Sequence, residues 1–191
     1  MRRLFLVRHA PTHAKIMVGW SDLPADCSDA ASFARLDAIL PQTAALVSSD
    51  LSRAVATADG LAGQRLRLPH VPGLREMDFG AWELRGFAEI EAEAPEHIRA
   101  FWERPGDISA PGGESWNALV ARVLQALDGL LAQGGGDLVI VSHFGPIVAA
   151  IQRADGLTAE VAFGHRIENL SVTEIEVDGD TWRLVRANHL A

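Results

Sequence analysis

Short apolar runs alternate with helical patterns along this chain. Apolar runs bounded by turn-forming residues predict buried strands at residues 4–7, 45–47 and 138–141. Helical patterns between and after these runs predict helices at residues 29–40, 52–61, 115–131 and 147–152, the first with Asp29 as its N-cap. Alternating strands and helices predict an α/β fold. We expect a three-layer sandwich with a mainly parallel central sheet and helices on both faces.

Two stretches depart from this alternation. Residues 172–185 alternate between apolar and polar positions around Asp178-Gly179-Asp180, which predicts a hairpin. Residues 73–114 fit neither pattern well, and we expect them to form a small, partly helical cap over one end of the sheet. The expected organisation is a single domain over residues 1–191, a length that can bury a core without a disulfide or a metal.

The charge balance excludes several classes of function. The chain has 25 Asp and Glu residues against 17 Lys and Arg, a net charge of -8, whereas nucleic-acid backbones select basic surfaces. Lys15, the only lysine, follows Ala14 and so cannot belong to a Walker A phosphate loop. The lone Cys27 excludes an internal disulfide.

No apolar run reaches the length of about 18 residues that crosses a membrane. The run after Met1-Arg2-Arg3 is also shorter than the roughly 7 to 15 apolar residues of a signal peptide. We therefore expect a cytoplasmic protein with no nucleic-acid or membrane partner, and a homodimer is left open.

Basic side chains follow all three predicted strands. Arg8 and His9 come after the first strand, Arg53 begins the helix after the second, and His143 follows the third. Ligands of open α/β sheets bind beyond the carboxyl ends of the strands. Amides at the starts of the following helices add donors for an anion. The sequence therefore predicts a phosphate pocket at this edge.

These residues also suggest two other kinds of site. His9, His13 and His143 could hold a metal, but Pro11 interrupts a helix across the first two and two arginines would repel a cation. Residues 141–145 could form the nucleophile elbow of a hydrolase, but His143 occupies the place of the serine.

A set of motifs occurs in order along nearly the whole chain: Arg8-His9-Ala10-Pro11-Thr12, Gly19-Trp20-Ser21-Asp22-Leu23-Pro24, Ser48-Ser49-Asp50-Leu51-Ser52-Arg53-Ala54, Leu74-Arg75-Glu76-Met77-Asp78-Phe79-Gly80-Ala81-Trp82-Glu83, Pro111-Gly112-Gly113-Glu114-Ser115, Ser142-His143-Phe144-Gly145 and Asn169-Leu170-Ser171-Val172-Thr173. The set resembles branch 1 of the histidine phosphatase superfamily, the phosphoglycerate-mutase-like branch. The chain departs from the usual pattern at Ala10, Pro11, Lys15, Leu84 and Phe144. These departures leave the core catalytic groups in place and put the substrate contacts in doubt.

The resemblance implies a phosphohistidine mechanism without metal or other cofactor. His9 would be the nucleophile, and Arg8, Arg53 and His143 would bind the phosphoryl oxygens. Glu76 would protonate the leaving group and then activate water, with Glu83 as the other carboxylate to test.

The substrate contacts follow less directly from the resemblance. Six residues are expected to reach the phosphate or the substrate: Ala10 through its amide, Thr12, Lys15, Phe144, Trp20 and Trp82. Trp102 and Trp116 are further candidates for a cap. Two or more indoles at the pocket would favour a ring-bearing substrate such as α-ribazole 5'-phosphate.

We therefore predict a phosphomonoesterase acting on a small phosphorylated metabolite. A phosphoglycerate mutase is the first alternative, although its family members usually carry longer insertions. An idle phosphoryl-binding or scaffold protein is the second.

Overall fold

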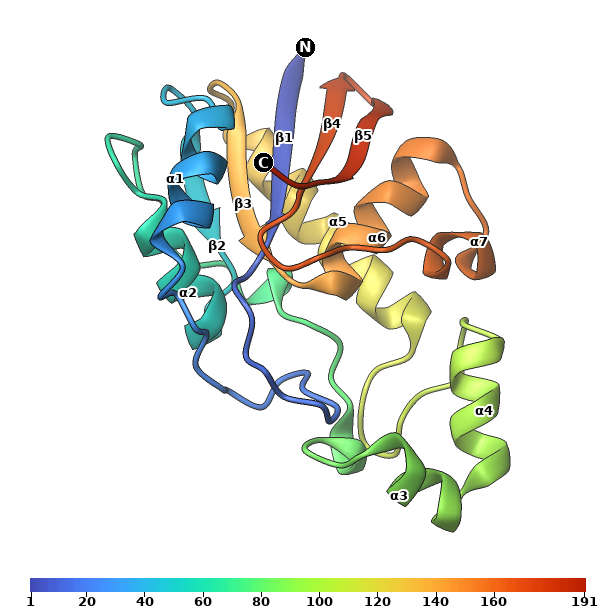
Figure 1. Cartoon of the computed structure of the whole chain (residues 1–191). Coiled ribbons are helices and arrows are strands. Elements are labelled where there is room, and N and C mark those ends of the chain that lie inside the picture. The colour runs from blue at the N-terminus through green and yellow to red at the C-terminus, as the bar shows by residue number, and fades with distance from the viewer.

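Five strands form one sheet in the order β2-β3-β1-β4-β5 (Figure 1). The computed structural model describes residues 1–191. The strands are β1 (Arg2–Arg8), β2 (Ala45–Ser48), β3 (Leu138–Ser142), β4 (Val172–Asp178) and β5 (Thr181–His189). All three predicted strands and the predicted hairpin are present.

The sheet is mixed, so the prediction of a mainly parallel sheet is wrong. The β2–β3 and β1–β3 pairs are parallel, whereas the β1–β4 and β4–β5 pairs are antiparallel. The chain after β3 returns to the carboxyl end of β1, where the Leu170 amide donates to the Arg8 carbonyl and the Arg8 amide donates to the Ser171 carbonyl. Strand β4 starts at that end and must therefore run in the opposite direction.

Seven α-helices surround or extend the sheet: α1 (Ala30–Ile39), α2 (Ser52–Gly60), α3 (Phe87–Glu93), α4 (Pro95–Glu103), α5 (Trp116–Ala132), α6 (Phe144–Asp155) and α7 (Ala159–Phe163). All four predicted helices are present, and Asp29 caps α1 by accepting the amide of Ser32. Helix α6 starts three residues before the predicted position, and α7 was not predicted. None of the helices is long and apolar enough to cross a membrane.

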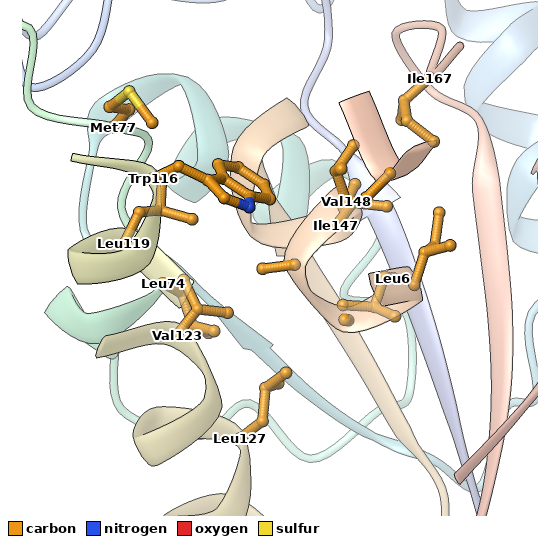
Figure 2. Close-up of a cluster of buried hydrophobic side chains, with 14 of the residues drawn as sticks. Leu6, Leu74, Met77, Trp116, Leu119, Val123, Leu127, Ile147, Val148 and Ile167 are labelled. Carbon is orange, nitrogen blue, oxygen red and sulfur yellow. The ribbon is translucent and has the colours of Figure 1, made fainter. Parts of the chain in front are cut away.

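The core lies on both faces of the sheet, because successive side chains of a strand point to opposite sides. Phe5 and Val7 of β1 belong to a cluster with residues of α1 and α2. Leu4 and Leu6 belong to the larger cluster with residues of α5 and α6. Figure 2 shows part of the larger cluster, with Trp116, Leu119, Val123 and Leu127 of α5 in a row beside Ile147 and Val148 of α6.

The segment of residues 73–114 carries α3, α4 and a 3-10 turn, Gly80–Trp82. A second 3-10 turn, Pro72–Leu74, leads into it. Figure 1 places α3 and α4 beyond the carboxyl ends of β1 and β3, at the opposite end of the molecule from the N-terminus. This is the end at which the strand-terminal basic residues lie.

Candidate active site

The parallel pairing of β1 with β3 brings two histidines together. Arg8 is paired with Ser142 in the register, so the next residues, His9 and His143, leave the sheet side by side. The His9 amide donates to the Ser142 carbonyl at 3.0 Å. The two imidazole rings lie with their centroids 5.0 Å apart.

His9 is buried and neutral. Burial is the largest effect and lowers its pKa to about 3. The hydrogen bond with the Ala10 carbonyl opposes burial, and the positive charges of Arg53 and Arg8 add to it. His9 Nδ1 lies 2.7 Å from that carbonyl oxygen, which can only accept a hydrogen bond. The proton therefore resides on Nδ1, and Nε2 carries a free lone pair.

Arg8 and Arg53 bring positive charge to this pair without a carboxylate partner. Arg53, in the first turn of α2, donates to the carbonyls of Gly19 at 2.6 Å and Ser21 at 2.9 Å. Arg8 donates from Nη1 to the Ile167 carbonyl at 2.6 Å, and its buried Nε has no acceptor. Burial lowers the pKa of both guanidinium groups, which nevertheless stay charged.

His143 is fully buried, and neither of its ring nitrogens has a hydrogen-bond partner. Burial lowers its pKa well below the usual value, and His9, Arg53 and Arg8 lower it further. Unpaired buried polar atoms are rare and costly in proteins. The nitrogens of His143 and the Nε of Arg8 are therefore suited to a ligand with several oxygen atoms.

Glu76 supplies a carboxyl group that favours its protonated form. Burial raises its pKa, although Arg53 and Arg8 and two amide donors oppose this effect. The amides of Met77 and Gly145 both donate to Oε1, each at 3.0 Å. Oε2 is thus the oxygen left to exchange a proton with a ligand.

The model of the histidine phosphatase superfamily (branch 1) matches residues 4–190. The chain belongs to this superfamily. The bifunctional protein Rv2228c of Mycobacterium tuberculosis (strain ATCC 25618 / H37Rv) is 33% identical over 195 residues, covering 93% of this chain and 51% of that protein. The chain thus spans about half the length of the mycobacterial relatives it matches.

Two phosphatases are similar over nearly their full length. The adenosylcobalamin/alpha-ribazole phosphatase of Escherichia coli (strain K12) is 26% identical over 185 residues, covering 92% of this chain and 90% of that protein. The mycobacterial glucosyl-3-phosphoglycerate phosphatase Rv2419c, solved in complex with inorganic phosphate, superposes with a TM-score of 0.86 at 28% identity, covering 99% of this chain and 98% of that one. These names agree with the predicted enzyme class, a phosphatase.

In this member of the superfamily, Glu83 organises the loop that holds Arg53. Its carboxylate accepts hydrogen bonds from the amides of Gly19, Trp20, Ser21 and Phe79 and from the Ser21 hydroxyl. Burial alone would raise its pKa, but these donors lower it below the usual value. Glu83 is therefore a fixed anion behind Arg53, while Glu76 is the carboxyl group suited to proton transfer.

Thr12 and Lys15 line a hollow of about 390 Å³ together with Arg8 and His9. Asn169, which sequence reasoning did not single out as a site residue, also lines it and donates from Nδ2 to the His9 carbonyl at 2.7 Å. The motif Asn169-Leu170-Ser171 was the signal that could have identified it.

Several residues predicted to contact the substrate lie elsewhere in the structure. The Ala10 amide already donates to Thr57 Oγ1 at 2.9 Å, so the prediction that it binds phosphate is wrong in this conformation. Trp82 is also wrong as a pocket residue, because it is buried and packs edge-on against His97 and Phe101. Trp20 lines no part of the hollow; its indole nitrogen donates to the Glu76 carbonyl at 2.8 Å.

Phe144 lies near the site, with the Arg8 guanidinium 6.0 Å from its ring centroid. His13, the third histidine of the metal hypothesis, is exposed and its Nε2 pairs with Asp26 Oδ2 at 2.9 Å. It lines the hollow beside His9, but His143 does not. No group of three or more His, Cys, Asp or Glu side chains in the structure could hold a metal ion.

Proposed function

We propose that this chain is a metal-independent phosphomonoesterase that acts through a phosphohistidine at His9. The observation that carries the proposal is the set of unpaired groups around the neutral His9: both ring nitrogens of His143 and the Nε of Arg8. A phosphate dianion offers acceptor oxygens for the Arg8 Nε and for the one ring N–H that a neutral His143 carries. Family membership supports the same assignment.

The first half-reaction transfers the phosphoryl group to His9. The Nε2 lone pair attacks phosphorus while the bond from phosphorus to the ester oxygen breaks, with its electron pair going to that oxygen. Glu76 delivers a proton to the departing oxygen. Arg8, Arg53 and His143 stabilise the charge on the three oxygens that stay with phosphorus.

The second half-reaction releases phosphate. Water attacks phosphorus, Glu76 takes a proton from it, and the phosphorus–nitrogen bond breaks with its electron pair returning to Nε2. The raised pKa of the Glu76 carboxyl supports this two-way role, because such a group can hold the proton before the first step and accept one in the second.

The proposed substrate is a small phosphorylated metabolite, and α-ribazole 5'-phosphate is the specific candidate. The name of the Escherichia coli relative supports this candidate. Residues 73–114 act in this proposal as a cap that belongs to the single domain of residues 1–191, because they carry Glu76 and lie beyond the carboxyl edge of the sheet.

His9→Ala tests the proposal. We expect the hydrolysis of p-nitrophenyl phosphate to fall at least about a thousandfold, since the nucleophile is lost. His165→Gln is a matched control, because His165 bonds only a carbonyl of α7. Near-normal turnover by His9→Ala would contradict the proposal.

A second measurement separates hydrolysis from the mutase alternative. We expect one inorganic phosphate to be released for each alcohol formed, with a chelator having little effect. Phosphate that stays esterified on another hydroxyl would show a mutase. Inhibition by the chelator that a divalent ion reverses would favour the metal alternative.

A further inference from the structure

An apolar hollow of about 340 Å³ adjoins the phosphate pocket. Six of its seven lining residues are hydrophobic, and the seventh is lysine: Lys15, Ile16, Met17, Val18, Phe79, Phe87 and Trp102. Lys15 also lines the hollow of about 390 Å³ beside Arg8 and His9, so the two spaces share a wall. Ile16 and Phe87 leave 42% and 44% of their surface exposed, which is unusual for large apolar side chains that serve only the core.

The hollow also leads toward the carboxyl group of Glu76. Phe79 and Trp102 line a second, smaller cavity together with Glu76, Phe144 and Phe163. A leaving group departing from phosphorus must meet the acid that protonates it. The space beside Glu76 is therefore where the alcohol part of a substrate would lie.

Trp102 adds a specific feature to this wall. Its ring lies 5.0 Å from that of Phe101 and 6.1 Å from that of Phe163 between centroids. Its indole nitrogen is buried and donates to no acceptor. Leaving such a donor unpaired is unfavourable, so a ligand acceptor in this position would gain from it.

We propose that this hollow is the leaving-group subsite, and that it selects phosphate monoesters whose alcohol carries a flat apolar group. The inference rests on the proposed function for the direction of the leaving group. Transfer of an apolar ring from water to these walls is favourable. A polyhydroxylated alcohol would lose its hydrogen bonds to water there, and these side chains cannot replace them.

Binding of unreactive phosphonates tests the subsite without requiring turnover. Propylphosphonate and 3-phenylpropylphosphonate differ only by the ring, so calorimetry on the wild-type protein isolates its contribution. We expect the phenyl compound to bind about tenfold or more tightly, as burial of one ring allows. Equal affinities would overturn the subsite, whether or not the protein hydrolyses esters.

Substitutions of the residues that line the hollow test whether the ring binds there. Phe87→Ala removes a half-exposed side chain, so folding is retained, and we expect the preference for the phenyl compound to fall about threefold or more. Leu66→Ala is the control, because Leu66 is 70% exposed and does not line the hollow; its carbonyl accepts the amide of Leu46 near the amino end of β2. Trp102→Ala should also lower the preference, whereas Trp102→Phe keeps a ring in the wall and should retain it. A preference that survives unchanged in both Phe87→Ala and Trp102→Ala would overturn the proposal.

A different set of contacts carries a second inference, about the backbone of Glu76. Its carbonyl accepts hydrogen bonds from Trp20 Nε1 at 2.8 Å and from Arg122 Nη2 at 3.2 Å. Arg122 Nη1 donates to the carbonyls of Gly73 and Arg75, each at 3.0 Å. One guanidinium group on α5 thus donates hydrogen bonds to three backbone carbonyls around the proposed acid.

Arg122 is itself fixed. It forms two hydrogen bonds of 2.7 Å with Glu114, and the ring of Trp20 lies 5.9 Å from its guanidinium carbon. We infer that Arg122 and Trp20 are positioning residues that set the Glu76 carboxyl group against the leaving oxygen. This inference also rests on the proposed function.

The dependence on leaving group tests this role. Ethyl phosphate needs protonation of its alkoxide, whereas p-nitrophenyl phosphate needs it much less. We expect Arg122→Lys and Trp20→Phe to lower kcat for ethyl phosphate at least about fivefold more than for p-nitrophenyl phosphate. Arg153→Lys is the matched control, since Arg153 also pairs with a carboxylate, Asp128, and lies over an indole, that of Trp182. Equal losses for the two esters would assign Arg122 and Trp20 to general stability and overturn the inference.

Discussion

Arginines occupy both the pocket and the wall behind it, with opposite surroundings. In the pocket, Arg8 and Arg53 bond only backbone carbonyls, and burial lowers the pKa of both. In the wall, Arg75 forms two hydrogen bonds with Asp50, at 2.7 and 2.5 Å, which raise the pKa of Arg75. Arg122 is paired with Glu114 in the same manner.

The difference separates binding from positioning. A buried charge without a counter-ion is unfavourable until a ligand brings the opposite charge. A charge that already has its carboxylate gains little from a ligand and instead fixes the chain around it. In the proposed reaction the same residue type therefore binds phosphate in one region and holds the Glu76 segment in the other.

Arg8→Met should have the largest effect. We expect turnover of p-nitrophenyl phosphate to fall on the order of a hundred- to a thousandfold, because charge stabilisation in transfer is lost. The free energy of unfolding should stay equal or rise, since an uncompensated buried charge is removed. Steady-state kinetics and urea unfolding measure the two quantities. A large loss of stability would show that Arg8 serves the fold instead.

Stabilisation by bound phosphate should also distinguish the arginines of the pocket from those of the wall. At a concentration about a hundred times its Kd, phosphate stabilises a folded protein by about 2.7 kcal/mol. For a chain of this size we expect Tm to rise by about 5 to 10 °C in the wild type and in Arg75→Met, but not in Arg8→Met. A shift retained by Arg8→Met would contradict the assignment of that charge to the ligand.

Arg75→Met should lower stability and largely preserve turnover, the reverse of Arg8→Met, and its effects should be smaller. It leaves Asp50 partly buried without its partner, and we expect the free energy of unfolding to fall by about 1 to 2 kcal/mol. Turnover should change less than about tenfold, because Arg75 does not touch the phosphate in the proposed reaction. A turnover loss as large as that of Arg8→Met would remove the distinction between pocket and wall.

The pH dependence of the free energy of unfolding tests the neutral state of His9 in the pocket. The pKa of His9 is about 3 in the folded chain and near 6.5 when unfolded, so between these values the unfolded chain binds a proton that the folded chain does not. Stability should therefore rise with pH in this window, by up to about 1.4 kcal/mol per pH unit for His9 alone. Between pH 5 and 6.5, the free energy of unfolding should change less with pH in His9→Leu than in the wild type. Parallel dependences would contradict a buried, neutral His9.

The sequence predicted the elements more reliably than their assembly. The three apolar runs fixed the strands because a buried strand needs a continuous apolar run, and Asp29 capped the first helix as its position indicated. The direction of β4 was missed. It depends on hydrogen bonds of Leu170 and Ser171 to Arg8, which lie some 160 residues away along the chain.

The substrate side shows the same limit. A tryptophan beside a glycine or a glutamate can line a pocket, fill a core or hold a backbone carbonyl, and the pattern of neighbours does not distinguish these roles. Trp82 packs against Phe101, and the Trp20 indole bonds the Glu76 carbonyl, because of the path that residues 73–114 take beyond the carboxyl edge of the sheet. Asn169 reaches His9 for a similar reason.

The sequence by itself determined which groups gather at the carboxyl edge, since Arg8, His9 and His143 follow parallel strands and have no other direction in which to leave them. Only the tertiary structure decided which of them lack partners. Burial and the direction of each hydrogen bond depend on atoms from distant segments. These two factors keep His9 neutral, leave His143 unpaired and raise the pKa of the Glu76 carboxyl group.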